Sequence, residues 1–268
     1  MPASPASAFP AIPTRVDTVL AFIDRITNAP SMEALWRAHV EAMAGYGFDR
    51  LVYGFTRYRS GRSLGDPQDW IVLTNQPRAY MEPFINDGLY FNGPMIRWAL
   101  ENDGACSWSW LSRMAATGGL TPAELKVLEF NRRLGVSAGY TISFRSVSSR
   151  TKGAIGLIAR PGMSQDQVDA IWDRSGQEIT VLNNAAHLTI QTLPYPGARH
   201  LTPRQKEVLQ WVGDGKTAQD IALLMGLTPA TIEKHLRLAR EALDVDTTAQ
   251  AVLKASFQNQ MFTRPEMA

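Results

Sequence analysis

The sequence predicts an α+β protein of two domains, and three observations support this fold class. The chain has 268 residues, which is more than one small domain needs. Apolar spacing over residues 14–190 predicts the element order ααββ–α–ββ–α, which favours helices packed on an antiparallel sheet over a doubly wound fold. From Leu201 onward every expected element is a helix. We therefore expect an N-terminal domain with an antiparallel sheet, followed by an all-α domain of four helices.

The elements of the N-terminal domain follow from apolar periodicity and from turn residues. One helix has a clear beginning and end: Thr121 caps it, Pro122 fits its first turn, Glu124 reaches back to the cap, and Gly135 ends it. The other expected helices cover 14–27, 31–44 and 164–190, and short helices interrupted by proline and glycine cover 77–101. The expected strands cover 51–55, 70–73, 140–144 and 154–158.

The domain boundary is expected where proline and glycine cluster between two helical patterns. Residues 193–200 carry two prolines and a glycine, which favour an extended connector. Residues 1–13 hold four prolines among small residues and are expected to form a flexible tail. The predicted organisation is a tail over 1–13, a first domain over 14–192, a linker over 193–200 and a second domain over 201–262.

Composition excludes several classes of protein. Hydrophobic residues make up 45% of the chain and charged residues 19%, which is ordinary for a globular protein and excludes a wholly disordered one. A net charge of +2 excludes a strongly basic coat, and the single cysteine, Cys106, indicates a reducing compartment. The first residues lack the pattern of a secretory signal, and no apolar run is long enough to span a membrane. We expect a cytoplasmic protein.

The C-terminal segment has the spacing of a helix-turn-helix. Helices are expected to begin at Thr202, Thr217 and Thr228, and Gly226 suits the tight turn before the third helix. Four apolar residues make one buried stripe on that third helix: Ile232, Leu236, Ala239 and Leu243. The polar residues of the opposite face can enter a major groove about 12 Å wide. The candidate DNA-binding residues are Thr217, Thr228, Thr231, Glu233, Lys234 and Arg237.

The charge of this segment leaves a plainer alternative open. Residues 200–268 hold eight Lys and Arg and eight Asp and Glu, so there is no basic footprint of the kind that favours DNA. The four helices could then be a structural appendage with solvated polar faces. Helix N-termini can still bind phosphate, and Lys216, Lys234 and Arg237 can supply local positive charge.

Residues 201–252 resemble the LuxR-type helix-turn-helix domain. The matching residues include LTPRQ at 201–205, GKT at 215–217 and TIEKHL at 231–236. Domains of this type bind DNA as dimers, so the resemblance implies double-stranded DNA and a homodimer as partners. Two positions depart from the family: Gln205 stands where glutamate is usual, and Glu233 stands where relatives often carry Lys or Arg. An acidic Glu233 cannot hold a phosphate, but it can accept a hydrogen bond from cytosine N4.

Residues 30–190 are similar, more loosely, to the autoinducer-binding domain of quorum-sensing LuxR-type receptors. The stretches that match best run from Thr74 to Arg97, over Ser107–Trp108 and over Gly135–Gly139. The resemblance implies an α/β/α sandwich, in which a ligand lies between the sheet and one helical layer, and acyl-homoserine lactones are the usual signals. Gly139 matches the family's glycine, and Trp108 matches a tryptophan that lines the lactone end.

The polar ligand contacts of that family are not all present. Gln76, Tyr80 and Phe84 replace a common Tyr/Trp/Tyr set, and Gly156 stands where relatives often carry a hydroxyl. Gly93 replaces the aspartate that accepts a hydrogen bond from the ligand amide. A charged hydrogen bond contributes about 1.5–3 kcal/mol, so its loss weakens binding of a homoserine-lactone amide by roughly one to two decades. We therefore expect a small, largely apolar ligand, either an acyl-homoserine lactone or a related non-standard molecule.

The candidate ligand-binding residues combine the matched positions with nearby aromatic residues, each of which is also compatible with plain core packing. They are Tyr53, Gln76, Tyr80, Phe84, Gly93, Trp108, Gly139 and Gly156, with Trp70, Tyr90 and Trp110 as further aromatic lining.

Other chemistry has little support in the sequence. The four histidines are scattered without a zinc-binding spacing, and neither a phosphate-binding loop nor a G-x-S-x-G elbow is present. We expect no enzyme activity, no metal and no cofactor. Two functions stay open: a ligand-controlled transcription factor, and a ligand-independent regulator or heterodimerising antagonist of a quorum-sensing receptor. Because Gly93 replaces the family's aspartate, the second function is favoured somewhat more here than in an ordinary family member.

Overall fold

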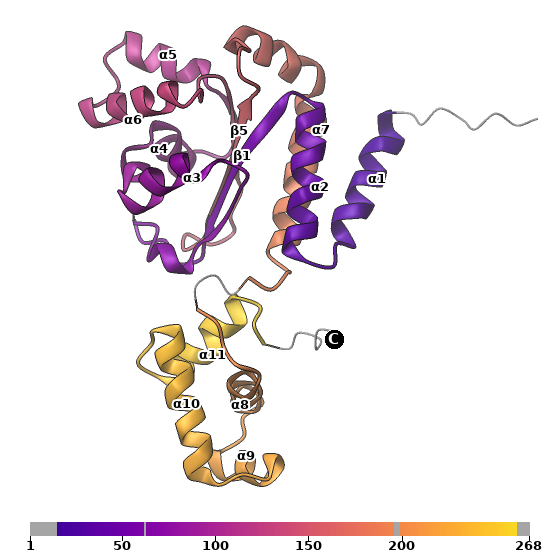
Figure 1. The fold of residues 1–268 in the computed structure, drawn as a ribbon, viewed down its shortest axis with the longest axis vertical. Coiled ribbons are helices and arrows are strands. Elements are labelled where there is room, and N and C mark those ends of the chain that lie inside the picture. The colour runs from indigo at the N-terminus through magenta and orange to yellow at the C-terminus, as the bar shows by residue number, and fades with distance from the viewer. Residues whose placement is uncertain (1–14, 62, 196–198, 262–268) are drawn as a thin grey trace, which may run out of the picture.

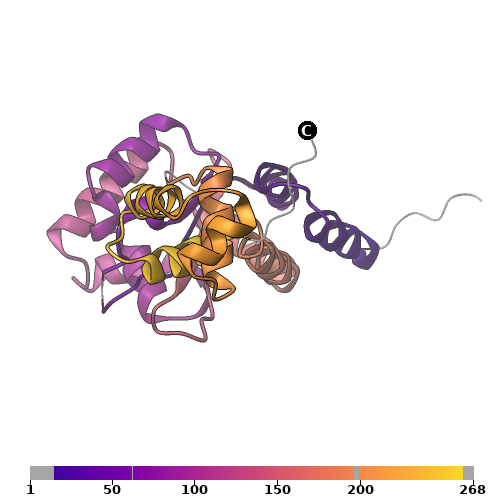
Figure 2. The same cartoon turned by 90° about the horizontal axis from the view of Figure 1, so that it is seen from below.

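The structure is a computed structural model that describes residues 15–61, 63–195 and 199–261. Four parts of the predicted organisation lie outside the described residues: the tail over 1–13, residue 14 at the start of the first domain, residues 196–198 of the linker, and residue 262 at the end of the second domain. A larger domain with a sheet lies at one end of the molecule, and a smaller helical domain lies beneath it (Figure 1). In the view from below, the C-terminal helices lie in front of the sheet domain and α1 lies to one side (Figure 2).

The described residues form one antiparallel sheet of five strands in the order β2-β1-β5-β4-β3. The strands are β1 (Phe48–Thr56), β2 (Ile71–Thr74), β3 (Gly104–Ser107), β4 (Gly139–Phe144) and β5 (Lys152–Ala159). In the centre of the sheet, Val52 pairs with Gly156 and Thr141 pairs with Gly156 from the other side. The strand β3 was not among the predicted strands, because its four small residues lack an alternation of large apolar side chains.

Helices cover both faces of the sheet, so the domain is an α/β/α sandwich and the predicted fold class is confirmed (Figure 1). One face carries α2 (Met32–Gly45) and α7 (Gln165–Ile190), and α1 (Arg15–Thr27) packs against these two helices. The large apolar core lies between these helices and the sheet, with Leu35, Leu51, Leu157 and Ile179 fully buried. Ser164 begins α7 with a capping box that involves Gln167, which explains why this long helix starts where the sequence predicts.

Short elements cover the opposite face of the sheet. They are α3 (Arg78–Met81), the π turn η2 (Glu82–Asn86), the 3-10 turn η3 (Leu89–Asn92), α4 (Pro94–Glu101), α5 (Ser109–Ala116) and α6 (Pro122–Arg133). The capping box of Thr121 and Glu124 begins α6 as predicted. A further 3-10 turn, η1 (Pro67–Asp69), lies in the connection between β1 and β2.

The described part of the C-terminal domain consists of helices: α8 (Pro203–Gly213), α9 (Ala218–Met225), α10 (Pro229–Leu243) and α11 (Thr248–Phe257). Thr202, Thr217 and Thr228 cap the first three helices, as predicted, and Gly226 has the positive φ of 65° that ends α9. The four predicted stripe residues of α10 are buried in one core with Val208, Leu209 and Ile221. Among the described residues, no helix is both long and apolar enough to cross a membrane.

Candidate functional site

A cavity of about 420 Å³ lies between the sheet and the layer formed by α3 to α6. Strand alternation decides which side chains face it. In β1, Val52 and Gly54 line the cavity, whereas the intervening side chains of Leu51, Tyr53 and Phe55 are buried in the core on the other face. The opposite wall is formed by side chains from η2, α4, α5 and α6, so two layers that are distant in sequence enclose the space.

Six of the predicted ligand residues belong to the described lining of this cavity: Tyr53, Tyr80, Phe84, Gly93, Trp108 and Gly156. The rings of Tyr80 and Phe84 are stacked with centroids 5.4 Å apart, and the Tyr80 hydroxyl donates to Asn131 Oδ1 at 3.1 Å. Burial raises the pKa of Tyr80 well above its usual range, so this hydroxyl stays protonated. The resulting wall is aromatic and already hydrogen-bonded.

Two further predicted aromatics, Trp70 and Tyr90, meet edge to face at the same cavity, with ring centroids 4.9 Å apart. Trp70 Nε1 donates to the carbonyl of Leu64 at 2.7 Å. Both rings therefore form a fixed wall at the β2 side of the cavity.

Gly139 acts on the cavity through Trp108. A Cβ at Gly139 would lie 2.2 Å from the Leu157 carbonyl oxygen and 3.2 Å from the Trp108 ring, so only glycine leaves room there. With the ring pressed against the strand, Trp108 Nε1 donates to Thr141 Oγ1 at 2.9 Å. Gly139 is absent from the described cavity lining, and its effect is to hold Trp108 in place.

Two more of the predicted residues lie outside the described lining, and a third belongs to it although its side chain packs in the core. Tyr53 belongs to the lining, but its side chain is buried in the core, because residues 51, 53 and 55 alternate toward the α7 face. Gln76 is buried after the end of β2, where its backbone N–H donates to Thr74 Oγ1, and it lies outside the described lining. The Trp110 ring also lies outside that lining, with the Arg97 guanidinium 5.7 Å from its centroid.

The two predicted glycines of the lining, Gly93 and Gly156, lie on opposite sides of the cavity and have different surroundings. A Cβ at Gly156 would meet its nearest atoms only at 3.9 Å, so this position leaves the floor of the cavity open. A Cβ at Gly93 would lie 3.2 Å from the Tyr90 carbonyl oxygen and 3.3 Å from the Ile96 side chain. A side chain at position 93 therefore fits only after a small adjustment of both the Tyr90 carbonyl and the Ile96 side chain.

The polar atoms of the cavity wall are largely engaged within the protein. Lys152 Nζ donates to Asp103 Oδ1 at 2.8 Å and to the Asn102 carbonyl at 3.0 Å, and the indoles of Trp70 and Trp108 have the partners given above. Among the described residues that line the cavity, none is Asp or Glu. The site therefore presents apolar and aromatic surface with no negatively charged acceptor.

The lining residues that the sequence reasoning missed, such as Val52, Thr141 and Asn131, belong to strands and helices that had been predicted correctly. Period-two alternation from Leu51 could have assigned Val52 and Gly54 to the face opposite Tyr53. The contribution of Asn131 depends on the packing of α6 over the sheet, which no local pattern indicates.

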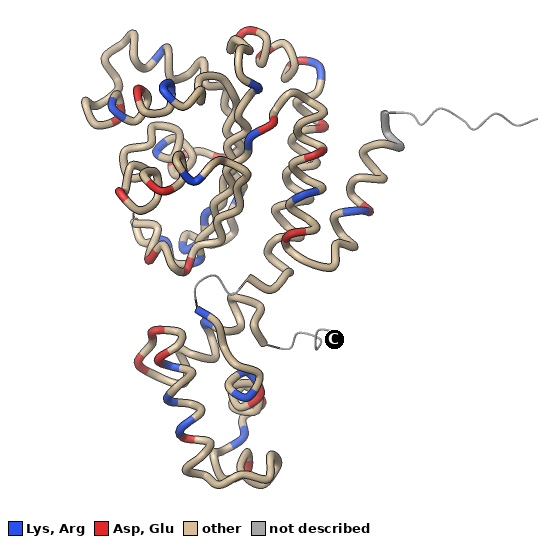
Figure 3. Tube along the Cα trace, viewed as in Figure 1, with Lys and Arg blue, Asp and Glu red and all other residues tan. Residues whose placement is uncertain are grey.

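The helix α10 presents the predicted DNA-reading residues on one side of the C-terminal domain. Glu233 and Lys234 are exposed, and Thr231 is half-buried. Arg237 is exposed but forms an ion pair with Glu241 at 2.6 Å, one turn further along the helix. Lys and Arg are interspersed with Asp and Glu over this domain, without a single basic stripe in the described helices (Figure 3).

The threonines at the helix starts are engaged in capping. The Thr228 hydroxyl lies 2.9 Å from the Thr231 hydroxyl and accepts from the Thr231 backbone N–H. Thr217 exchanges hydrogen bonds with Asp220, and the Thr217 hydroxyl is the main reason that the pKa of Asp220 is lowered. These two residues position the starts of α9 and α10, from which backbone N–H groups face outward.

Comparison with known proteins decides the family. Residues 31–190 match the family described as "Autoinducer binding domain", and residues 199–255 match "Bacterial regulatory proteins, luxR family". The chain belongs to the LuxR family of quorum-sensing transcriptional regulators. The matched domains are those of regulators and not of enzymes, so this LuxR-family protein is a transcriptional regulator with an autoinducer-binding domain and a helix-turn-helix domain.

Relatives of this LuxR-family protein include known transcriptional regulators. The transcriptional activator AnoR of Acinetobacter nosocomialis is 24% identical over 78% of this chain and 84% of its own length. The quorum sensing-dependent regulator RpaR of Rhodopseudomonas palustris is 26% identical over 75% of this chain and 81% of its own.

Two solved structures share the fold. The LuxR family factor CepR2 of Burkholderia cenocepacia, described as N-acylhomoserine lactone dependent, covers 65% of this chain and 94% of its own, with TM-score 0.51 and 19% identity. SdiA in complex with octanoyl-rac-glycerol covers 93% of this chain and 98% of its own, with TM-score 0.51 and 14% identity. At sequence identities this low, the two structures establish only the fold of this chain.

Proposed function

We propose that this regulator binds double-stranded DNA as a homodimer through α10, under the control of a small, largely apolar signal in the 420 Å³ cavity. The cavity between sheet and helices carries the proposal, because its size is that of a small-molecule site and its wall is formed and mostly apolar. In this proposal residues 14–192 form the sensor domain, 193–200 the linker and 201–262 the DNA-binding domain, and the protein acts in the cytoplasm.

The chemistry of the cavity favours a neutral signal with few donors. A buried amide N–H needs an acceptor, and an unpaired one costs about 1–3 kcal/mol. Since no carboxylate belongs to the described lining, an ester or other non-amide acyl compound loses less on burial than an acyl-homoserine lactone does. The fold shared with SdiA supports this, because that structure is described as a complex with octanoyl-rac-glycerol, an ester without an amide.

The proposed DNA contacts divide into positioning and reading contacts. Lys234 and Arg237 bind phosphates, and the helix starts capped by Thr217 and Thr228 present backbone N–H groups to them. Thr231 and Glu233 face base edges, where the Glu233 carboxylate accepts from cytosine N4. Arg237 must exchange its bond with Glu241 for a phosphate, which lowers the net gain from that contact.

A second function is favoured by one observation. Gly93 removes the acceptor for an acyl-homoserine lactone, so the protein can also act without ligand, either alone or as a heterodimer that antagonises a true receptor. The cavity opposes this reading, because a regulator without a ligand gains stability from a filled core.

The proposal is tested by two measurements on the purified full-length chain. Duplexes are first enriched from a random pool and their affinity is measured, with DNA binding as a dimer expected. Calorimetry and thermal shift then compare octanoyl-rac-glycerol with a panel of N-acyl-homoserine lactones, and a ligand at 100 times its Kd stabilises the fold by about 2.7 kcal/mol. Failure to enrich any duplex would overturn the DNA-binding function, and nanomolar affinity for a homoserine lactone would overturn the non-amide signal. DNA affinity that no compound changes would favour the second function.

A further inference from the structure

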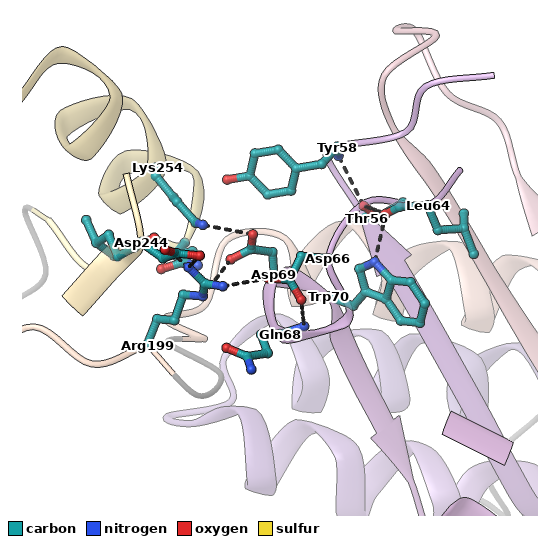
Figure 4. A network of polar contacts seen from close by, with 12 residues as sticks. Thr56, Tyr58, Leu64, Asp66, Gln68, Asp69, Trp70, Arg199, Asp244 and Lys254 are labelled. Carbon is teal, nitrogen blue, oxygen red and sulfur yellow. Dashed lines mark hydrogen bonds and ion pairs between the residues drawn. The ribbon is translucent and has the colours of Figure 1, made fainter. Parts of the chain in front are cut away.

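The side chain of Arg199 joins the two domains. The sequence places this residue in the linker, but its side chain is only 6% exposed and is surrounded by carboxylates (Figure 4). Its Nη2 lies 2.6 Å from Asp66 Oδ2, and its Nε lies 3.4 Å from Asp69 Oδ1. Its Nη1 lies 3.0 Å from Asp244 Oδ2 and donates to the Leu243 carbonyl at 2.8 Å. One guanidinium thus contacts the sensor domain and the end of α10 together.

The C-terminal domain offers Arg199 the carboxyl end of the recognition helix. Leu243 is the last residue of α10, and Asp244 caps the helix with φ 55° and ψ 61°. A helix C-terminus carries partial negative charge and unpaired carbonyls, so a cation there is favourable. The Asp244 side chain is 79% exposed, so water screens its ion pair and the bond to the Leu243 carbonyl is the firmer attachment.

The sensor domain offers Arg199 a turn that is also part of the cavity wall. Asp66 caps the turn η1 and Asp69 ends it, and the next residue is Trp70, which lines the cavity. Trp70 Nε1 and Thr56 Oγ1 both donate to the Leu64 carbonyl, at 2.7 Å and 2.8 Å, so the turn is fixed to β1 (Figure 4). The Asp69 side chain is 8% exposed and also receives Lys254 Nζ of α11 at 2.8 Å.

We propose that Arg199 is a positioning residue that couples the cavity wall at Trp70 to the recognition helix α10. The proposal rests on the proposed function only in taking α10 as the DNA-reading helix. A shift of Trp70 moves η1, and the buried Asp69 cannot leave Arg199 and Lys254 without losing compensation for its charge. A movement of η1 therefore either moves the end of α10 with it or breaks the ion pairs of Arg199 with Asp66, Asp69 and Asp244 together.

The other described contacts near the domain boundary involve the linker and the end of α11 and not α10. Tyr195 in the linker donates through its hydroxyl to the Val72 carbonyl at 3.2 Å, and Asn259 donates to the carbonyls of Gln191 and Leu193. These bonds hold the linker and the end of α11, whereas the Arg199 contacts reach α10 itself. This difference makes Arg199 the residue to test.

The test is a double-mutant cycle on the full-length chain that needs no identified ligand. Trp70→Phe perturbs the cavity wall by removing the bond to Leu64, and Arg199→Gln removes the link. Hydrogen exchange of the amides at 240–244, at the end of α10 and its cap, is measured in both single variants, the double variant and wild type. We expect Trp70→Phe to change this exchange at least about threefold in wild type and less than twofold in the Arg199→Gln background, since coupled residues are not additive. Equal effects in both backgrounds overturn the proposal.

Three further variants serve as controls for this interpretation. Arg204→Gln removes an exposed pair with Glu207 in the same domain and is expected to leave the response to Trp70→Phe unchanged. If Arg199→Gln does not fold, Asp66→Asn replaces it, because Asp66 is half-exposed and its loss is milder. Arg199→Lys keeps the charge but lacks the planar fork, so it is expected to restore only part of the coupling; full restoration would contradict the bridging role.

The outcome is separable from that of the proposed function. Coupling between Trp70 and α10 in a protein that enriches no duplex refutes DNA binding and supports the positioning role. Enriched duplexes together with additive exchange effects support DNA binding and overturn the positioning role.

Discussion

The Tyr53 hydroxyl lies 2.8 Å from Nδ1 of His187, in the core on the side of the sheet away from the cavity. His187 also stacks on Phe144 with ring centroids 4.0 Å apart, and a Cβ at Gly153 would lie 2.7 Å from its ring. Burial lowers the pKa of His187 to about 4. On the same side of the sheet, His39 Nε2 lies 3.0 Å from Asn183 Oδ1, and burial lowers its pKa to about 4 as well. Both histidines are therefore neutral in the folded protein.

We predict that the protein loses stability as pH falls from about 6.5 to 4. In the unfolded chain the two histidines take up protons near pH 6.5, whereas the folded chain cannot protonate them until about pH 4. The free energy of unfolding therefore falls over this window, by about 2 kcal/mol for each histidine between pH 7 and pH 5. Urea denaturation at several pH values measures the change. His200→Gln serves as control, because His200 is exposed, and equal stability at pH 7 and pH 5 would refute the prediction.

We predict that Gly93→Asp restores affinity for N-acyl-homoserine lactones. The carboxylate supplies the acceptor that the cavity lacks, and a charged hydrogen bond raises affinity by roughly one to two decades. The backbone at Gly93, with φ −71° and ψ 112°, is in a conformation that any residue adopts, and the added side chain requires only a small shift of its neighbours Tyr90 and Ile96. Calorimetry against N-octanoyl-homoserine lactone is the measurement, with octanoyl-rac-glycerol as a ligand whose affinity should not rise. Gly93→Asn is the matched variant without charge, and an equal gain with Asn would show that the charge is not the cause.

We predict that Gly139→Ala destabilises the sensor domain, whereas Gly54→Ala does not. The added methyl at position 139 meets the Leu157 carbonyl at 2.2 Å and the Trp108 ring at 3.2 Å, and such overpacking costs about 1–3 kcal/mol. At Gly54, on a neighbouring part of the sheet, nothing lies within 4 Å of the added Cβ. Chemical denaturation compares the two variants. Equal stability of both would mean that Trp108 is not held by Gly139.

We predict that Lys234→Ala weakens binding to all duplexes alike. Loss of one phosphate contact reduces the slope of log affinity against log salt by about 1, because one fewer counterion is released. Glu233→Gln is expected instead to relax the preference at a single base position. Salt titrations with an enriched duplex and with an unrelated one measure both effects. Lys126→Ala on α6 is the charge-matched control; a salt slope that falls equally in this variant would contradict the assignment.

The C-terminal domain could be predicted almost entirely from the sequence, because its determinants are local. The caps at Thr202, Thr217 and Thr228 and the spacing of Ile232 and Leu236 depend on residues a few positions apart. The sheet was less predictable: β3 is short and built of small residues. The direction of Tyr53 also required the register of the strand to be placed against a layer that is distant in sequence.

The site was predictable only where a resemblance or a local pattern pointed to it. Trp108 and Gly139 were singled out by resemblance, and the structure adds why the two go together. Arg199 gave no signal, since its partner Asp66 lies 133 positions earlier in the chain and the residue itself lies in the predicted linker. Ion pairs across a domain boundary have no sequence period from which they could be inferred.

The alternation along β1 separates two tasks on one strand. Val52 and Gly54 touch the space that a signal would fill, while Leu51, Tyr53 and Phe55 hold the far layer together. Substitutions at the first pair can therefore change which compound is accepted at little risk to folding. Single substitutions at alternate positions of β1 can therefore change the ligand specificity of this protein during evolution while the core on the other face stays intact.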